Sequence, residues 1–237
     1  MAKNGFEGKL GEEYELLLKA IPHYTALEES AGLTLRRNLQ DITRDRLKVV
    51  EIGCGTGITT PYILEADSRI SLTCIDNERI MIDQAKKRTY STENRNKIRF
   101  LVRDAQEYFK SLPQNSLDAV VSAWVLHNIP EDIRSELLQD IYRSLRIGGI
   151  FVNADKIAQD GKEHERQLKW QLDRLKVYDT IGRSDYRAEW EAHYKFDNQP
   201  GIIWRKSRLI SDLSTAGFKV IQKTFRKHME ATYVAKK

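Results

Sequence analysis

Short apolar runs alternate with segments of helical spacing through the middle of the chain. Runs typical of strands cover residues 47–52, 70–75, 98–102, 117–123 and 150–154, and the fourth is nearly all apolar, as in a strand covered on both faces. Helical spacing predicts helices over 80–88 and 133–145, the second stopped by Gly148 and Gly149. This alternation predicts βαβ units, and we therefore expect a doubly wound α/β domain in three layers, with a mostly parallel sheet.

The two ends of the chain follow other patterns. Residues 9–40 have helical spacing that Pro22 interrupts, so a second helix is expected over 25–39. Near the other end, the strand-like runs 218–225 and 231–235 have only a short turn between them, which requires an antiparallel hairpin. The sheet is therefore expected to finish with an antiparallel C-terminal hairpin strand.

The segment between the fifth parallel strand and the hairpin is rich in aromatic residues. It includes a helix with His164, Leu168, Leu172 and Leu175 on one face, and it carries three of the four tryptophans. Ligands of doubly wound sheets bind beyond the carboxyl ends of the strands, where this segment would lie. We interpret it as a helical lid. A single domain, 1–237, is then divided into cap helices (1–44), a ligand-binding core (45–154), the lid (155–216) and the hairpin (217–237).

Composition narrows the class of protein. Of 237 residues, 41% are hydrophobic, which supports a full core, and we find no apolar run long enough to span a membrane. The first residues lack the apolar stretch of a signal peptide, and Cys54 and Cys74 have no disulfide-framework spacing, so we expect free thiols and a cytoplasmic location. Lys and Arg outnumber Asp and Glu by nine to two over 200–237, a pattern that suits a solvated basic face or an anion-binding surface.

The most specific motif is the turn after the first strand, Glu51-Ile52-Gly53-Cys54-Gly55-Thr56-Gly57. Glycines allow positive φ and let a ligand approach the backbone closely. The spacing E-x-G-x-G-x-G differs from the G-x-G-x-x-G of dinucleotide-binding proteins. A carboxylate at Glu51 would repel a pyrophosphate, whereas it can meet an ammonium group or organise the loop. The motif therefore indicates a nucleoside-like, cationic ligand.

Two further carboxylates end the next two strands. Asp76 ends the second strand, where it can accept hydrogen bonds from both ribose hydroxyls, and Asp104 ends the third, where it can accept from an adenine amine. An aspartate at a strand end is also common as a turn former or helix cap. Together with the glycine turn, the two carboxylates define one ligand crevice.

These residues resemble the class I S-adenosylmethionine (SAM)-dependent methyltransferases, which have a Rossmann-like fold, over about residues 45–154. The resemblance implies that SAM is the cofactor and assigns residues to its parts. The methionyl end would meet the glycine turn and the end of the fourth strand, the ribose would meet Asp76, and the adenine would meet Asp104. The implied cofactor residues are Tyr14, Tyr24, Glu51, Gly53, Gly55, Gly57, Asp76, Asn77, Met81, Asp104, Ala105, Ser122 and Ala123.

A narrower likeness concerns segments outside the core. Residues 21–24, 152–155 and 216–218 are similar to segments of small-molecule methyltransferases and, more loosely, of carboxy-SAM synthase, an enzyme of tRNA modification. In such enzymes N-terminal helices close over SAM, so Tyr14, His23 and Tyr24 are candidates for that cap, or they simply pack the helices.

Methyl transfer is a displacement on a sulfonium, and a general base is needed only for a protonated acceptor. His127, just after the fourth strand, is the first candidate base, followed by Asp155 at the end of the fifth strand and His193 in the lid. Each of these three residues could instead cap a helix, form a turn or pack against its neighbours. Substrate contacts are predicted for Trp124, His127, Trp170, Trp190, Tyr194 and Arg205. The histidines lack metal-ligand spacing, and no metal is expected.

The sequence thus predicts transfer of the SAM methyl group to a small molecule at O, N or activated carbon, by a monomer or homodimer. A carboxy-SAM or other SAM-using enzyme of tRNA modification, and an RNA methyltransferase, stay as alternatives; nucleic acid as a partner is not favoured. An alternative from another class is a non-catalytic SAM-binding regulatory protein, which we would expect to lack a lid. A nicotinamide-dependent dehydrogenase is disfavoured by the glycine spacing.

Overall fold

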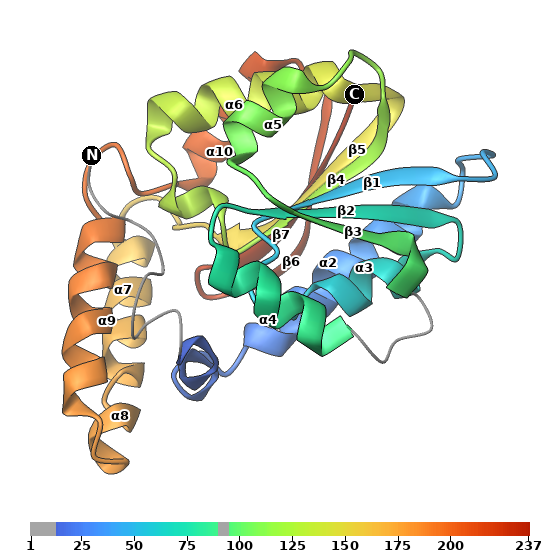
Figure 1. Ribbon diagram of the computed structural model, residues 1–237. Helices are drawn as coiled ribbons and strands as arrows, with labels where there is room; N and C mark the ends of the chain where they lie inside the picture. Colours follow the sequence, from blue (N-terminus) through green and yellow to red (C-terminus); the bar gives the residue numbers. More distant parts are fainter. Residues whose placement is uncertain (1–12, 90–94) are drawn as a thin grey trace.

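The computed structural model describes residues 13–89 and 95–237, and its centre is a seven-stranded sheet (Figure 1). The strands lie in the order β3-β2-β1-β4-β5-β7-β6. Only β7 runs against its neighbours β5 and β6; the other pairs are parallel. The bounds are β1 Leu47–Ile52, β2 Ile70–Asp76, β3 Ile98–Val102, β4 Leu117–Ala123, β5 Leu145–Lys156, β6 Val220–Lys227 and β7 Glu230–Lys236. The predicted doubly wound fold with an antiparallel hairpin strand is confirmed.

Helices cover both faces of the sheet and make it the middle of three layers. In Figure 1 the helices α2, α3 and α4 lie below the sheet, and α5, α6 and α10 lie above it. Every residue of the central strand β4 is buried, because both of its faces are covered. The bounds are α2 Tyr24–Leu39, α3 Thr60–Ala66, α4 Arg79–Thr89, α5 Ala105–Ser111, α6 Glu131–Ser144 and α10 Lys206–Ala216, with 3₁₀ helices η1 Tyr14–Lys19, η2 Arg95–Lys97 and η3 Leu126–Asn128.

The start of β5 corrects one prediction. The glycines at 148 and 149 were expected to end the helix before the strand, but α6 ends at Ser144 and β5 begins at Leu145. The register with β4 shifts between Leu117 and Ala119, which pair with Leu145 and Ile150. The extra residues bulge out of the ladder, and a positive φ of 77° at Gly148 accommodates the bend. The glycines thus shape a bulge inside the strand.

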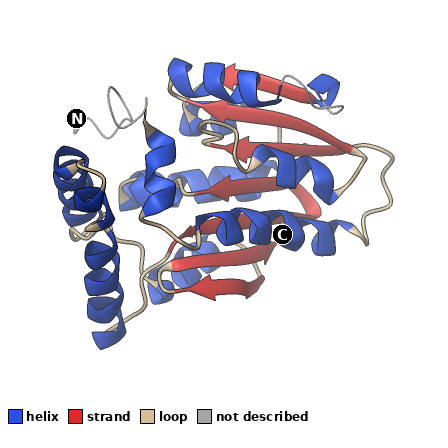
Figure 2. Cartoon of the chain, turned by 90° about the horizontal axis from the view of Figure 1, so that it is seen from below, coloured by secondary structure: helices blue, strands red, loops and turns tan. Residues whose placement is uncertain are grey.

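The predicted lid contains several helices. Between β5 and α10 lie α7 Lys162–Arg174, α8 Val177–Thr180 and α9 Ser184–Asp197. Figure 2 shows these helices standing beside the sheet, away from its two covered faces. Leu175, Tyr178, Tyr186 and Trp190 are buried in one apolar cluster with residues of η1 and α2. The lid helices are therefore packed against the N-terminal segment, and the two together border the carboxyl ends of the strands.

The inner face of α7 is more polar than its apolar pattern predicts. Leu168 and Leu172 are half-buried, whereas Gln167 and Gln171 are buried. Gln167 accepts a hydrogen bond from the backbone of Gln159 and donates one to the His228 carbonyl. Gln171 makes neither of these hydrogen bonds and lines a small cavity. No helix in the described part of the chain is long and apolar enough to cross a membrane.

Candidate active site

The glycine turn joins β1 to α3 and has the backbone that its sequence predicts. Gly53 and Gly55 have φ of 59° and 51°, values that favour glycine. A Cβ at Gly53 would lie 2.4 Å from Val125 Cγ2, whereas a Cβ at Gly55 would meet nothing within 4 Å. The glycine at 53 is therefore required by contact with the β4 end, and the glycine at 55 leaves the backbone open to a ligand.

Asp76 ties the glycine turn to the end of β2. Its Oδ2 accepts a hydrogen bond from the Gly55 backbone N–H at 2.9 Å, and its Oδ1 accepts from Glu78 N at 2.9 Å. Burial raises the pKa of the Asp76 carboxyl, although these two N–H groups oppose the rise. One side chain thus holds the turn in place while it borders the cavity above it.

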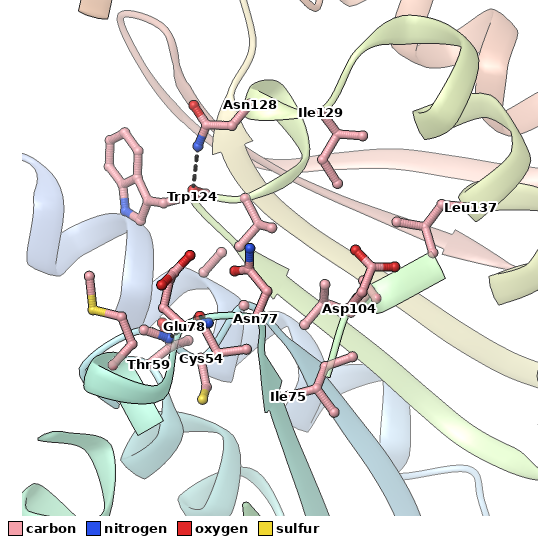
Figure 3. A pocket seen from close by; sticks show the side chains of 18 of the residues that line it. Cys54, Thr59, Ile75, Asn77, Glu78, Asp104, Trp124, Asn128, Ile129 and Leu137 are labelled. Carbon is pink, nitrogen blue, oxygen red and sulfur yellow. Dashed lines mark hydrogen bonds between the residues drawn. The ribbon is translucent and has the colours of Figure 1, made fainter. Parts of the chain in front are cut away.

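Asp104 ends β3 and serves as the N-cap of α5. Its Oδ1 accepts from Glu107 N at 3.0 Å, so the turn-and-cap role considered from the sequence is present. The same residue lines the cavity with Ala105. In Figure 3, Asp104 lies between Ile75 and Leu137, while Trp124 and Thr59 lie across the cavity from it. An exposed capping carboxylate beside apolar side chains can accept a hydrogen bond from the polar edge of a flat ring.

The cavity over the strand ends has a volume of about 890 Å³, ample for a nucleoside ligand. It brings together most of the predicted cofactor residues, from the glycine turn, from β2 and β3 and from the end of β4. Its lining includes Tyr24, Gly53, Gly55, Asp76, Asn77, Met81, Asp104, Ala105, Ala123 and Trp124. The open Gly55 backbone and the two strand-end carboxylates fit a nucleoside with a cationic tail.

Other predicted cofactor residues lie outside this lining. Gly57 packs against α4, where an added Cβ would be 3.1 Å from Ala85 Cα, and Ser122 is fully buried within β4. Tyr14 begins η1, but its side chain lies outside the described part of the structure. Gly57 and Ser122 thus shape the fold beneath the cavity and do not border it.

Glu51 holds the loop and does not border the cavity. It is 2% exposed and accepts hydrogen bonds from Thr60 Oγ1 and Cys74 Sγ, so of its two predicted roles the structure has the organising one. Burial is the main cause that raises its pKa to about 8. A carboxyl group that is protonated at neutral pH stabilises the turn through hydrogen bonds rather than through its charge.

The carboxylate that does border the cavity is Glu28 of α2, which sequence analysis missed. It accepts a hydrogen bond from Thr59, and burial raises its pKa to about 7, while Thr59, Tyr24 and Trp124 oppose the rise. Glu28 follows Tyr24 by four residues and so shares its face of the helix. That spacing is the sequence signal that could have identified Glu28 once Tyr24 had been chosen.

Trp124 separates this cavity from a smaller one beneath the lid, because it lines both. Its φ of 60° is rare for a bulky residue, and its ring stacks on Tyr24 with centroids 5.2 Å apart. Asn128, which also lines both cavities, donates to the Trp124 carbonyl at 3.3 Å (Figure 3). A strained backbone held by such contacts fixes the tryptophan at the boundary.

His127 and Asp155 form a buried pair at the ends of β4 and β5. His127 Nδ1 lies 2.5 Å from Asp155 Oδ1, and the two residues are 7% and 0% exposed. The Asp155 carboxylate also accepts from the backbone N–H groups of His127 and Lys156. With Nδ1 engaged by the carboxylate, Nε2 is the nitrogen left to exchange a proton. The structure thus brings two of the predicted catalytic residues into contact.

A buried ion pair that sequence analysis missed lies beside this histidine. Lys156 Nζ is 2.8 Å from Asp197 Oδ2, and the Lys156 ammonium lies 4.1 Å from the centre of the Tyr194 ring. Lys156 follows Asp155 directly and Asp197 ends α9, so the pair joins the sheet to the lid. Its partners are 41 positions apart in the sequence, and no local pattern signals such a contact.

His193, the third predicted catalytic residue, lines the small cavity with Trp190 and Tyr194. Its Nε2 lies 3.5 Å from Asp197 Oδ1. Burial is the main cause that lowers the pKa of His193 to about 4, so its ring is neutral at pH 7 and is a weak base. His193 is therefore better placed to line the cavity than to accept a proton.

Two predicted substrate residues lie away from both cavities. Trp170 stacks on His228 with ring centroids 3.8 Å apart, and His23 stacks against the same pair. Arg205 directs its guanidinium to the carbonyl of Gln159. These side chains join α7, the hairpin turn and the start of α10 to the rest of the chain.

The chain was compared with known proteins. Residues 49–149 match the methyltransferase domain family. The carboxy-S-adenosyl-L-methionine synthase of Campylobacter fetus subsp. fetus (strain 82-40) is 26% identical over 224 residues, which cover 93% of this chain and 88% of the relative.

Solved structures share the fold. A carbon methyltransferase, CurJ, has a TM-score of 0.66 and 17% identity over 94% of this chain and 57% of its own. A structure of PigF with SAH has a TM-score of 0.58 and 17% identity over 86% of this chain and 53% of its own. The chain thus spans a little over half the length of these two proteins.

Proposed function

Because the chain belongs to the class I SAM-dependent methyltransferases, we propose that it transfers the methyl group of SAM to a small-molecule acceptor that His127 deprotonates. The observation that carries this proposal is the buried His127–Asp155 pair at the strand ends. It lies next to Trp124 and Asn128, the residues shared by the large cavity and the small one.

The residues of the large cavity suit the parts of SAM in turn. Asp76 would receive the ribose hydroxyls, Asp104 and Ala105 would hold the adenine, and the Gly53–Gly55 turn would follow the methionyl tail. When bound, SAM supplies an electrophilic methyl group on a sulfonium. Glu28 borders the cavity beside Thr59, where a carboxylate favours a nearby cation.

The His127–Asp155 pair would move the proton. Asp155 accepts the Nδ1 hydrogen bond and fixes the ring, so Nε2 takes a proton from the acceptor as the methyl group is transferred. The Asp155 carboxylate stabilises the imidazolium that forms. Trp124, stacked on Tyr24, would exclude water and align the acceptor with the cofactor.

The experiment replaces His127 with Asn, which keeps a polar side chain and loses the base. We expect kcat to fall by roughly 10²–10⁴, with the SAM dissociation constant, measured by calorimetry, within about twofold of wild type. S-adenosylhomocysteine formation is followed with a panel of phenols, amines and activated carbon acids. Wild-type turnover by the variant across pH 6–9 would remove His127 as the base. Absence of SAM binding by the wild type would refute the whole proposal.

A second candidate is formation of carboxy-SAM, favoured by the carboxy-SAM synthases similar to 93% of the chain. The two functions leave different products. Methyl transfer yields S-adenosylhomocysteine, whereas the second would yield SAM that has gained a carboxyl group, and mass spectrometry of the nucleoside separates them. A cytoplasmic location, the division into core and lid, and a monomeric or dimeric state stay predictions.

A further inference from the structure

Acidic side chains outnumber basic ones around the large cavity. Among the described residues that line it, Glu28, Asp76, Glu78 and Asp104 are acidic and Arg103 is basic. Asp76 and Asp104 already accept hydrogen bonds from backbone N–H groups, whose partial positive charge offsets part of their negative charge. A cavity with this excess of carboxyl groups favours a cationic ligand.

Glu28 is the most deeply buried of these acidic residues, at 1% exposed. Thr59 Oγ1 donates a hydrogen bond to one of its oxygens, and the side chains of Tyr24 and Trp124 also favour the ionised form. None of these three groups carries a positive charge. Within residues 13–89 and 95–237, no lysine, arginine or histidine forms an ion pair with Glu28. A ligand that brings the missing cation would therefore stabilise the buried carboxylate.

The place of Glu28 beside the glycine turn indicates which part of a ligand it would meet. Its partner Thr59 is the N-cap of α3, two residues after the turn, and lies across the cavity from Asp104 (Figure 3). Thr56, within the turn, is 3% exposed and lines the cavity, and its Oγ1 has no hydrogen-bond partner among the described residues. A carboxylate and a free hydroxyl on the methionyl side suit a group with several N–H donors, such as a primary ammonium.

Two stacked rings border the cavity beside Glu28. Tyr24 and Trp124 are both buried, and their ring planes are 6° apart with centroids at 5.2 Å. Apolar surroundings lower the local dielectric and strengthen the attraction between a carboxylate and a cation. Aromatic faces also attract cations directly. The rings therefore favour a charged group next to Glu28 more than an open groove would.

We propose that Glu28 is the counter-ion of the α-ammonium group of the bound cofactor, with Thr56 Oγ1 as a second acceptor, and that Glu28 gives up its proton as the cofactor binds. The inference rests on the proposed function, since it takes SAM as the ligand of the large cavity. It gives Glu28 the role of meeting an ammonium group, which the sequence offered to Glu51. It also makes cofactor affinity depend on pH.

Glu28 acts on ionisable groups of two neighbouring elements, Glu51 of β1 and Tyr62 of α3. Burial is the main cause that raises the pKa of both, and the charge of Glu28 adds to the rise. At pH 7 Tyr62 is protonated and Glu51, with a pKa of about 8, is mostly protonated. Glu28 has a pKa of about 7 and is therefore about half protonated before binding. An ammonium beside it would lower that pKa and release the proton.

The first test compares three nucleosides that differ at the methionyl end. SAM carries a sulfonium and an ammonium, S-adenosylhomocysteine carries the ammonium alone, and 5′-methylthioadenosine carries neither. Their binding to the full chain is measured by calorimetry at pH 7. Glu28→Gln keeps the shape of the side chain and loses its charge. We expect SAM and S-adenosylhomocysteine to bind roughly 10–100-fold more weakly to this variant, and 5′-methylthioadenosine to stay within about twofold of wild type.

Glu29→Gln is the matched control. It removes a carboxylate from the next position of α2, but Glu29 is exposed and does not line the cavity. The affinity of all three nucleosides should stay within about twofold of wild type.

The second test counts the protons released when S-adenosylhomocysteine binds, by calorimetry in buffers of different ionisation enthalpy. At pH 7 the wild type should release about half a proton more than Glu28→Gln, because Glu28 is about half protonated before binding. Subtracting the value of the variant removes the contribution of other groups, such as Glu51. In the wild type the release should increase as the pH falls from 8 to 6, and this profile decides the question if Glu28→Gln does not fold.

Three results would overturn the proposal. A loss of affinity confined to SAM would place the carboxylate at the sulfonium. Uptake of a proton would place a protonated Glu28 at the carboxylate of the cofactor tail, and equal weakening of all three nucleosides would limit Glu28 to a role in the fold. In each case the wild type still binds SAM and the methyltransferase proposal stands. A wild-type chain that binds neither SAM nor S-adenosylhomocysteine would refute the proposed function first.

Discussion

The large cavity and the small one are built in different ways. Backbone turns and carboxylates at the ends of adjacent parallel strands form the large cavity, as in the Gly55–Asp76 hydrogen bond. The small cavity depends on side chains from distant segments, such as Leu17 of η1, Lys156 of β5 and Gln171 of α7. The large cavity, which we propose as the cofactor side, is therefore specified by local motifs, and the small cavity on the lid side by tertiary packing. Substitutions on the two sides should have separable effects.

The largest effect on stability is expected on the cofactor side, at Gly53→Ala. The new Cβ would lie 2.4 Å from Val125 Cγ2 at a φ of 59°, and overpacking adds to the left-handed strain. We expect the free energy of unfolding to fall by about 2–5 kcal/mol, as measured by urea denaturation.

Gly55→Ala is the matched control for that substitution. It has a φ of 51° but no neighbour within 4 Å of the new Cβ, so the cost should be near 1 kcal/mol. Equal losses at the two positions would mean that contact with Val125 does not explain Gly53.

The next effect concerns cofactor binding through Asp76. Asp76→Ala removes the carboxylate that accepts from Gly55 N and borders the cavity. The SAM dissociation constant should rise by roughly 10–100-fold, because hydrogen bonds to charged groups contribute about 1.5–3 kcal/mol. Calorimetry with Gln171→Leu as the lid-side control should give nearly wild-type SAM affinity. A large loss in the control would break the separation between the two sides.

The Glu28 carboxyl makes the stability of the folded protein depend on pH. Its pKa in the folded protein is about 7, above the ordinary 4.5, so the folded state holds the proton more tightly than the unfolded state. Its stabilising contribution is complete below pH 4.5 and is lost as pH rises to about 7. The loss should be up to about 3 kcal/mol for a buried carboxyl shifted this far.

Glu28→Gln should therefore flatten the fall in stability between pH 5 and 7, measured by urea denaturation at several pH values. Glu51, with a pKa of about 8, contributes in the same direction and should leave a remaining slope up to that pH. Glu51→Gln is the matched control, because this variant keeps the fall in stability that is due to Glu28. An unchanged slope in Glu28→Gln would show that this carboxyl does not take up a proton on folding.

The smallest effect is expected at Trp170, a residue that the sequence assigned to the substrate. It stacks on His228 and lies outside both cavities. Trp170→Leu should lower the free energy of unfolding by about 1 kcal/mol through lost stacking and should leave the KM for the acceptor within about twofold. A rise in KM with unchanged stability would return Trp170 to the acceptor site.

The amino-acid sequence by itself determined the sheet, because its strands have apolar runs and strand-end signals that act over a few residues. The bounds of β1 and β4 agree with the predicted ranges, and Gly53, Gly55, Asp76 and Asp104 lie around one cavity as predicted. Their spacing carries the information, since parallel strands bring their carboxyl ends to one edge. The bulge at Gly148 was missed because a glycine signals a helix end and a strand bulge alike.

Only the tertiary structure decided how the lid meets the core. Three features depend on how helices pack across the sheet ends. They are the position of Glu28 rather than Glu51 at the cavity, the Lys156–Asp197 pair, and the position of Trp170 outside both cavities. Residue type limits what each side chain can do, but contacts between distant segments follow from packing that no local spacing encodes. For that reason the cofactor could be predicted from the chain alone, whereas the lining of the small cavity required the fold.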